Sequence, residues 1–293
     1  MNGHQHHRHL FADAEKEECA QGENEPLVQP PHPAPHIKRS FAFGKAECKR
    51  IWALAGPLMI QNVFGYSLSI VSAIAVGHLN NPTILSSVVL AGSIYNLTGL
   101  SIVVGLSAGM DTIAGQAYGA KNYRMLGTVL QRATLVCWVA CVPILLFYMH
   151  SAQILMTLGQ SEEIAKGAAR YLGIAGFTLL FSVLSTNTNR YLVTQQVVEP
   201  GMVCTAITSL LCPLYNWLLI YKFHMGLDGA AYAYVASNAT FTVLLAAYTA
   251  WRDLRMYREE PHLCTWPGFT WGAFEGWFQY LRYGGPAAAM ICW

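Results

Sequence analysis

The feature that most constrains this chain is a run of sixty residues without a charged side chain, from Ile51 to Met110. A soluble domain seldom buries so long an uncharged stretch, whereas a helix that spans a bilayer needs about 20 mostly apolar residues. Over the whole chain 54% of the residues are hydrophobic and 12% are charged, against about 25% charged in a typical soluble domain. We therefore expect an all-α integral membrane protein.

Six apolar segments are long enough to be transmembrane helices. They cover, in order, about residues 51–77, 85–110, 133–149, 171–193, 202–221 and 229–250. Pro82, which follows two asparagines, marks the turn between the first two segments. Residues 1–47 are polar and rich in Pro and His, a composition that cannot bury a core, so we expect a disordered tail there.

The distribution of Lys and Arg predicts the orientation, because loops on the cytosolic side carry an excess of these residues. With a cytosolic N-terminus, the cytosolic side holds Lys38, Arg39, Lys45, Lys49, Arg50, Lys121, Arg124, Arg132, Arg190, Arg252, Arg255 and Arg258. The other side holds Lys166, Arg170 and Lys222. We therefore expect a multi-pass protein with its N-terminus in the cytosol, and the sequence does not distinguish the plasma membrane from a vacuolar membrane.

The sequence contains no Walker A loop and no HExxH motif. The net charge of +2 gives no basic surplus of the kind that marks nucleic-acid binding. Cys137 and Cys141 are four residues apart and share a helix face, but no His or carboxylate is nearby to complete a zinc site. We expect no enzyme activity, no catalytic residues, no metal site and no cofactor, and the partners expected are lipids and small solutes.

Two stretches near the C-terminal end differ from the six segments. Residues 261–282 are crowded with Trp and Phe, which predicts an amphipathic helix in the headgroup layer. The following "YGGPAAAM" repeats the Gly-Pro of "LAGPLMI" at the start of the first segment, and each follows a basic residue, Arg282 or Arg50. Transporters are often built from two such repeats.

The most specific stretch follows the second segment and reads "SAGMDTIAGQAYGAKNYRMLG", from Ser107 to Gly127. It predicts a helix that emerges into the cytosol and turns back. Asp111 is expected to pair with Arg124 or Arg132 and so hold the loop, and glycines allow close backbone approach. The candidate residues of this signature loop are Asp111, Gly115, Gln116, Gly119, Lys121 and Arg124.

This stretch resembles the signature of the MATE (multidrug and toxic compound extrusion) family in its eukaryotic, plant-like branch. Further matches occur in order in "AGPLMIQN", "VGHL", "LQRA", "LGQSEEIA", "NRYLVTQ" and "TWPGFTWGAF". The resemblance implies two six-helix lobes that face each other across a cavity. It also implies export of organic solutes, cationic or xenobiotic, by antiport against protons or sodium ions.

On this resemblance, residues 48–260 form the six-helix N-terminal lobe, residues 261–282 the interfacial linker and residues 283–293 the stub of a seventh span. A lobe truncated there is expected not to be competent for coupled transport alone. Two alternatives stay open: an inactive fragment or incomplete gene model, and a half-transporter that acts as a homodimer.

The expected cavity is neutral, because no ionisable residue stands in the middle of any of the six segments. Ser72 and, roughly, Asn216 stand where prokaryotic relatives carry acids, and the resemblance places the eukaryotic coupling glutamate just beyond Trp293. The candidates for the substrate pathway are Gln61, Asn62, Ser72, Asn96, Asn187 and Asn216. An asparagine in a span can instead hydrogen-bond a neighbouring helix, and this alternative stays open for each.

Overall fold

The computed structural model describes residues 45–259, 265, 268, 271–274 and 276–292. Within these residues the chain forms helices and turns, with no strand. Most of the tail expected at residues 1–47 lies outside the described residues, and its last three residues already belong to the first described helix. In chain order the elements are α2 (Lys45–Gly77), α3 (Pro82–Ile94), the π-helix η1 (Tyr95–Leu100), α4 (Ser101–Gly119), α5 (Tyr123–Met149), α6 (Ser151–Thr157), α7 (Glu162–Ala175), α8 (Thr178–Thr194), α9 (Glu199–Asn216), the π-helix η2 (Trp217–Lys222), α10 (Gly226–Glu259), the 3₁₀-helix η4 (Trp271–Phe274) and α11 (Trp277–Cys292).

Five helical stretches of the described chain are long and apolar enough to cross a membrane, and α7 with α8 makes a sixth if the bent pair counts as one span. The all-helical, multi-pass architecture expected from the sequence is therefore confirmed. Local signals explain the turns. The Asn81 side chain accepts hydrogen bonds from the amides of Thr83 and Ile84, and Pro82 occupies the first turn of α3.

The fourth span differs from the continuous helix expected over residues 171–193. Its first part, α7, begins at Glu162, and α7 and α8 meet at an angle of 47°. The break falls at Gly176 and Phe177. Glycine weakens a helix interior because it loses more backbone freedom on folding than other residues do, which favours a break at this point.

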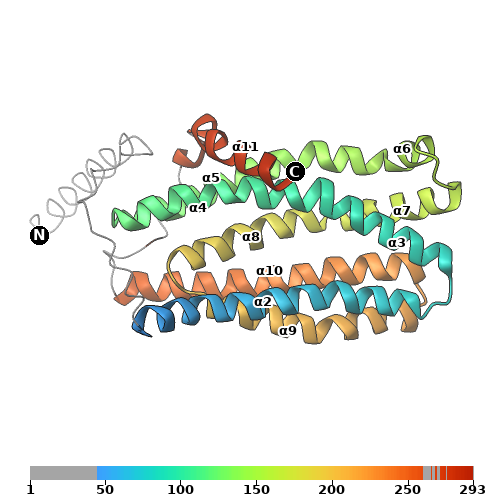
Figure 1. Cartoon of the computed structure of the whole chain (residues 1–293), viewed down its shortest axis with the longest axis horizontal. Coiled ribbons are helices and arrows are strands. Elements are labelled where there is room, and N and C mark those ends of the chain that lie inside the picture. Colours follow the sequence, from blue (N-terminus) through green and yellow to red (C-terminus); the bar gives the residue numbers. More distant parts are fainter. Residues whose placement is uncertain (1–44, 260–264, 266–267, 269–270, 275, 293) are drawn as a thin grey trace, which may run out of the picture. The chain divides into compact units, whose positions relative to one another are not determined.

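The helices pack with α8 in the middle, as Figure 1 shows. It contacts α4 and α5 on one side and α10 on the other, while α2 packs against α9. The buried core includes Tyr95, Tyr148, Leu172 and Leu179. One apolar face of α2 is not covered by other helices, and Val63 and Tyr66 on it are exposed.

Helix α11 lies against α4 (Figure 1). The backbones approach closely because both helices carry small residues at the contact. A Cβ on Gly105 would lie 2.3 Å from Ala288 Cα, and a Cβ on Gly109 would lie 2.7 Å from Gly284 Cα. The Tyr280 hydroxyl also donates a hydrogen bond to the Leu106 carbonyl oxygen at 2.8 Å.

The region expected to form one interfacial helix over residues 261–282 has a different local structure where it is described. It contains the short η4, and α11 continues through the expected boundary at residue 282. Gly268 and Gly276 have φ angles of +84° and +69°, which interrupt a right-handed helix. The segment is held by α5, because Gln131 Nε2 and Arg132 Nη2 donate to the carbonyl oxygens of Gly268 and Gly272.

Candidate functional site

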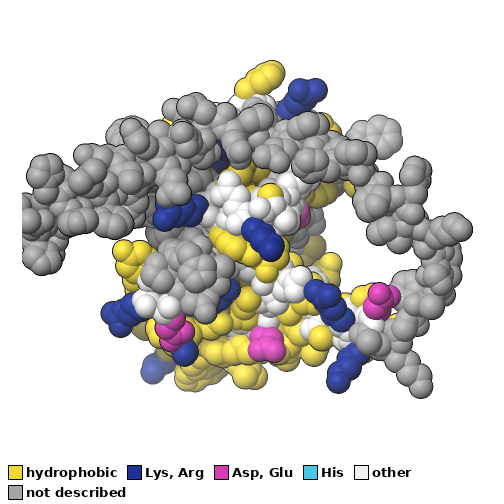
Figure 2. Space-filling model, turned by 90° about the vertical axis from the view of Figure 1, so that its left-hand side faces the viewer, with side chains coloured by type: hydrophobic (Ala, Val, Ile, Leu, Met, Phe, Trp, Pro, Cys, Tyr) yellow, Lys and Arg dark blue, Asp and Glu magenta, His cyan; other side chains and the backbone are white. Residues whose placement is uncertain are grey.

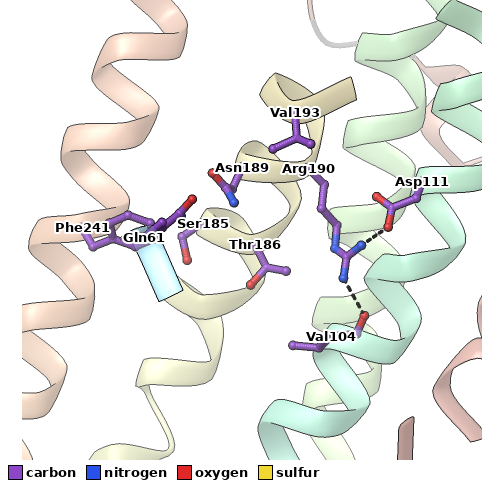
Figure 3. A pocket seen from close by; sticks show the side chains of 9 residues that line it. All are labelled: Gln61, Val104, Asp111, Ser185, Thr186, Asn189, Arg190, Val193 and Phe241. Carbon is purple, nitrogen blue, oxygen red and sulfur yellow. Dashed lines mark hydrogen bonds and ion pairs between the residues drawn. The ribbon is translucent and has the colours of Figure 1, made fainter. Parts of the chain in front are cut away.

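A pocket of about 410 Å³ opens between α2, α4, α8 and α10. Its lining residues are Gln61, Val104, Asp111, Ser185, Thr186, Asn189, Arg190, Val193 and Phe241. Five of them come from α8 at spacings of three and four residues, which places them along one stripe of that helix. Figure 3 shows Gln61 and Phe241 on one side of α8, and Val104 and Asp111 on the other.

The charged part of the pocket is an ion pair between the Arg190 guanidinium and the Asp111 carboxylate. Arg190 Nη2 also lies 3.4 Å from the carbonyl oxygen of Val104, one helix away. The Arg190 side chain is 22% exposed and that of Asp111 is 51% exposed. The pair therefore joins α4 to α8 at the edge of the pocket, where water partly screens the attraction.

The expected pairing of Asp111 with Arg124 or Arg132 is wrong. Lys121, with a φ of +61°, reverses the chain after α4, and Arg124 lies beyond that turn on α5. Arg132 instead donates to the Gly272 carbonyl oxygen. The pocket is charged at one edge, because α4 continues for two turns past Asp111 and α8 presents Arg190 to the same pocket. The neutral cavity expected between two lobes stays a prediction.

The polar part of the pocket beside this pair is built from two carboxamides, those of Gln61 and Asn189. Both reach the same point on α9, where residue 201 is a buried glycine. A Cβ on Gly201 would lie 2.5 Å from Asn189 Oδ1 and 3.0 Å from Gln61 Oε1. The missing side chain therefore makes room for both carboxamides.

The six substrate-pathway candidates do not gather at this pocket. Gln61 lines it, whereas the neighbouring Asn62 is exposed and donates to the carbonyl oxygen of Leu58 at 2.8 Å. Asn96 is exposed in η1. Asn187 is fully buried and donates to Thr134 Oγ1 at 3.3 Å, which joins α8 to α5.

The remaining two candidates meet each other between α2 and α9. Asn216 Nδ2 donates to the carbonyl oxygen of Cys212 at 2.9 Å and lies 3.4 Å from Ser72 Oγ. The Oδ1 atoms of Asn216 and Asn187 are buried without a hydrogen-bond partner. For Asn187 and Asn216 the visible contacts are those of helix packing, while a role in the substrate pathway stays a prediction.

Of the signature-loop residues, Asp111 reaches the pocket. The other five are exposed and surround the end of α4 and the start of α5: Gly115, Gln116, Gly119, Lys121 and Arg124. The close approach expected at the signature glycines is wrong for Gly115 and Gly119, because a Cβ on either would meet nothing within 4 Å. Close approach on α4 occurs instead at Gly105 and Gly109.

Sequence reasoning missed most of the α8 wall. Asn189 and Arg190 lie in the stretch "NRYLVTQ", and the charge pattern by itself assigns Arg190 only to the cytosolic side. The signal that could have found them is a helical spacing of polar residues. Ser185 and Asn189 are four residues apart, as are Thr186 and Arg190, so all four lie on one face of the helix. Among the described residues, no group of three His, Cys, Asp or Glu side chains could hold a metal ion.

A family model described as MatE matches residues 57–218, which is more than half of the chain. The chain belongs to the MatE family. The matched segment runs from α2 to η2 and includes eight of the nine residues that line the pocket. Phe241 on α10 lies beyond it.

Named members of the MatE family are similar over most of this chain. The DETOXIFICATION 13 protein of Arabidopsis thaliana is 34% identical over 249 residues, which cover 84% of this chain and 50% of that protein. The multidrug and toxin extrusion protein 1 of Mus musculus is 30% identical over 246 residues, or 84% of this chain and 42% of that protein. The chain thus spans about half the length of the relatives it matches.

The fold agrees with a solved transporter. The crystal structure of the eukaryotic MATE transporter AtDTX14 matches with a TM-score of 0.77 and 28% identity, over 84% of this chain and 53% of that one. An outward-facing MATE family transporter of the MOP superfamily matches with a TM-score of 0.69 at 19% identity, which bears on the fold alone. The expected family and helical-lobe architecture are confirmed.

Proposed function

We propose that this chain supplies the N-terminal lobe of an exporter of organic solutes, cationic or xenobiotic, that exchanges them against protons or sodium ions. The observation that carries the proposal is the pocket between four membrane-spanning helices, with an ion pair and two carboxamides in its wall. Its volume lies in the range of small-molecule sites, about 300–1,000 Å³. Membership of a family of transporters supplies the reaction class.

A second candidate is a half-transporter that assembles as a homodimer. The apolar face of α2, where Trp52, Val63 and Tyr66 are each more than two-thirds exposed, is the surface that a second copy would cover in place of lipid. The orientation proposed for either case has the N-terminus in the cytosol. Figure 2 shows Lys and Arg side chains spread over the end of the bundle that would then face the cytosol.

The test uses the 293-residue chain in proteoliposomes under an imposed proton or sodium gradient. We would measure binding and gradient-driven flux of a panel of organic solutes: ethidium, tetraethylammonium and adenine. A single lobe is expected to bind at least one of them saturably and to give no flux above empty liposomes. Arg190→Gln is expected to change that binding, because it removes one member of the ion pair in the pocket wall. Lys166→Gln, in an exposed ion pair elsewhere, serves as the matched control.

The other outcomes separate the alternatives. Flux that follows the fraction of chemically crosslinked dimer would favour the half-transporter. A chain that neither binds nor moves any member of the panel would contradict the proposed function and favour an inactive fragment.

A further inference from the structure

The two pocket carboxamides are held side by side by a glycine on a third helix. A Cβ on Gly201 would lie 2.5 Å from Asn189 Oδ1, 3.0 Å from Gln61 Oε1 and 3.1 Å from Gln61 Nε2. Both carboxamide ends therefore rest on the α9 backbone. Both residues line the pocket, although they come from α2 and α8.

The charged lining residues offer less to a ligand than their charges suggest. Among the described residues that line the pocket, Asp111 is the one carboxylate, and Arg190 already neutralises it. A quaternary ammonium ion would have to compete with that guanidinium for the carboxylate, and it has no hydrogen to donate to the carboxamides. The pocket therefore gives little advantage to a permanently charged solute.

A planar solute with adjacent hydrogen-bond donor and acceptor atoms fits the same lining better. Each carboxamide has an NH₂ donor and a carbonyl acceptor. Asn and Gln use these two groups together to recognise the donor–acceptor edge of adenine. Phe241, Val104 and Val193 add apolar surface, and Figure 3 shows Phe241 beside Gln61.

We propose that Gln61 and Asn189, seated on Gly201, form the recognition element of this pocket and select uncharged planar heterocycles with adjacent donor and acceptor atoms over quaternary ammonium ions. This inference rests on the proposed function, because it names the solute class of the same pocket. Gly201 acts as a positioning residue, since it contributes space and no contact of its own. A methyl group there displaces both carboxamides at once.

The test compares two probes, adenine and tetraethylammonium, by equilibrium dialysis against the full 293-residue chain in lipid nanodiscs. The wild-type chain is expected to bind adenine more tightly. Gly201→Ala and Gln61→Leu are each expected to weaken adenine binding by about tenfold or more, the effect of losing a paired hydrogen-bond contact. Both are expected to leave tetraethylammonium binding within about twofold.

Two matched controls separate recognition from general damage. Gly65→Ala makes the same change on α2, where a Cβ would meet nothing within 4 Å. Gln153→Leu makes the same change as Gln61→Leu at an exposed position on α6. Both control variants are expected to bind adenine as the wild-type chain does. If the Gly201→Ala chain fails to fold, adenine binding by Gln61→Leu tests the inference instead.

Two results would overturn the inference. One is a wild-type chain that binds tetraethylammonium more tightly than adenine. The other is adenine binding that Gln61→Leu leaves unchanged. If adenine fails to bind while ethidium or tetraethylammonium binds, the solute class is wrong and the proposed export function stands. If no solute of the panel binds or moves, the proposed function fails as well.

Discussion

Asp111 and Arg190 are 79 residues apart in sequence and join α4 to α8 at the pocket edge. We predict that Asp111→Asn costs more unfolding free energy than Arg190→Gln. The reason is that Asp111→Asn leaves the more buried partner, 22% exposed, without its counter-charge. The coupling energy from a double-mutant cycle, measured by denaturant unfolding, is expected to exceed the ~0–1 kcal/mol of exposed pairs.

The chain contains its own reference for this measurement. Glu162 and Lys166 form an i, i+4 pair whose side chains are 69% and 65% exposed. The same cycle on that pair is expected to give a smaller coupling energy, because water screens both of its charges. Equal coupling energies for the two pairs would show that the Asp111–Arg190 contact is no stronger than a solvated surface pair.

At the scale of elements, the contact between α4 and α11 depends on the absence of side chains. Gly109→Ala is predicted to push α11 away, because the new Cβ would lie 2.7 Å from Gly284 Cα and 2.8 Å from Gly284 N. Backbone atoms cannot rotate aside as a side chain can. Hydrogen–deuterium exchange of residues 277–292 is therefore expected to rise, while Gly115→Ala on the same helix leaves it unchanged because nothing lies within 4 Å. Unchanged exchange in Gly109→Ala would contradict the close packing.

At the scale of the whole molecule, the excess of basic residues at one end of the bundle predicts its orientation. Ala120→Cys and Gln160→Cys place single reactive thiols in exposed turns that follow α4 and α6. In a background with Cys19, Cys48, Cys264 and Cys292 replaced by Ser, an impermeant maleimide is expected to label Gln160→Cys in intact cells. Ala120→Cys is expected to react after permeabilisation only. The reverse pattern would place the N-terminus on the outer side.

The sequence by itself determined the class of the protein, since sixty uncharged residues and the spacing of six apolar segments leave few soluble alternatives. Ordered local motifs indicated the family, and Asn81 with Pro82 marked a turn that the structure confirms. These features are local, so they can be recognised without knowledge of which helices are neighbours.

Only the tertiary structure decided the partner of Asp111, the glycines at which helices touch, and the composition of the pocket wall. Arg190 pairs with Asp111 because α8 lies beside α4, which the sequence does not indicate. Gly201 matters because the side chains of Gln61 and Asn189 both reach it from other helices. The physical reason is that helical periodicity identifies the face on which a residue lies. The helix that packs against that face is chosen by side-chain shape across long sequence separations.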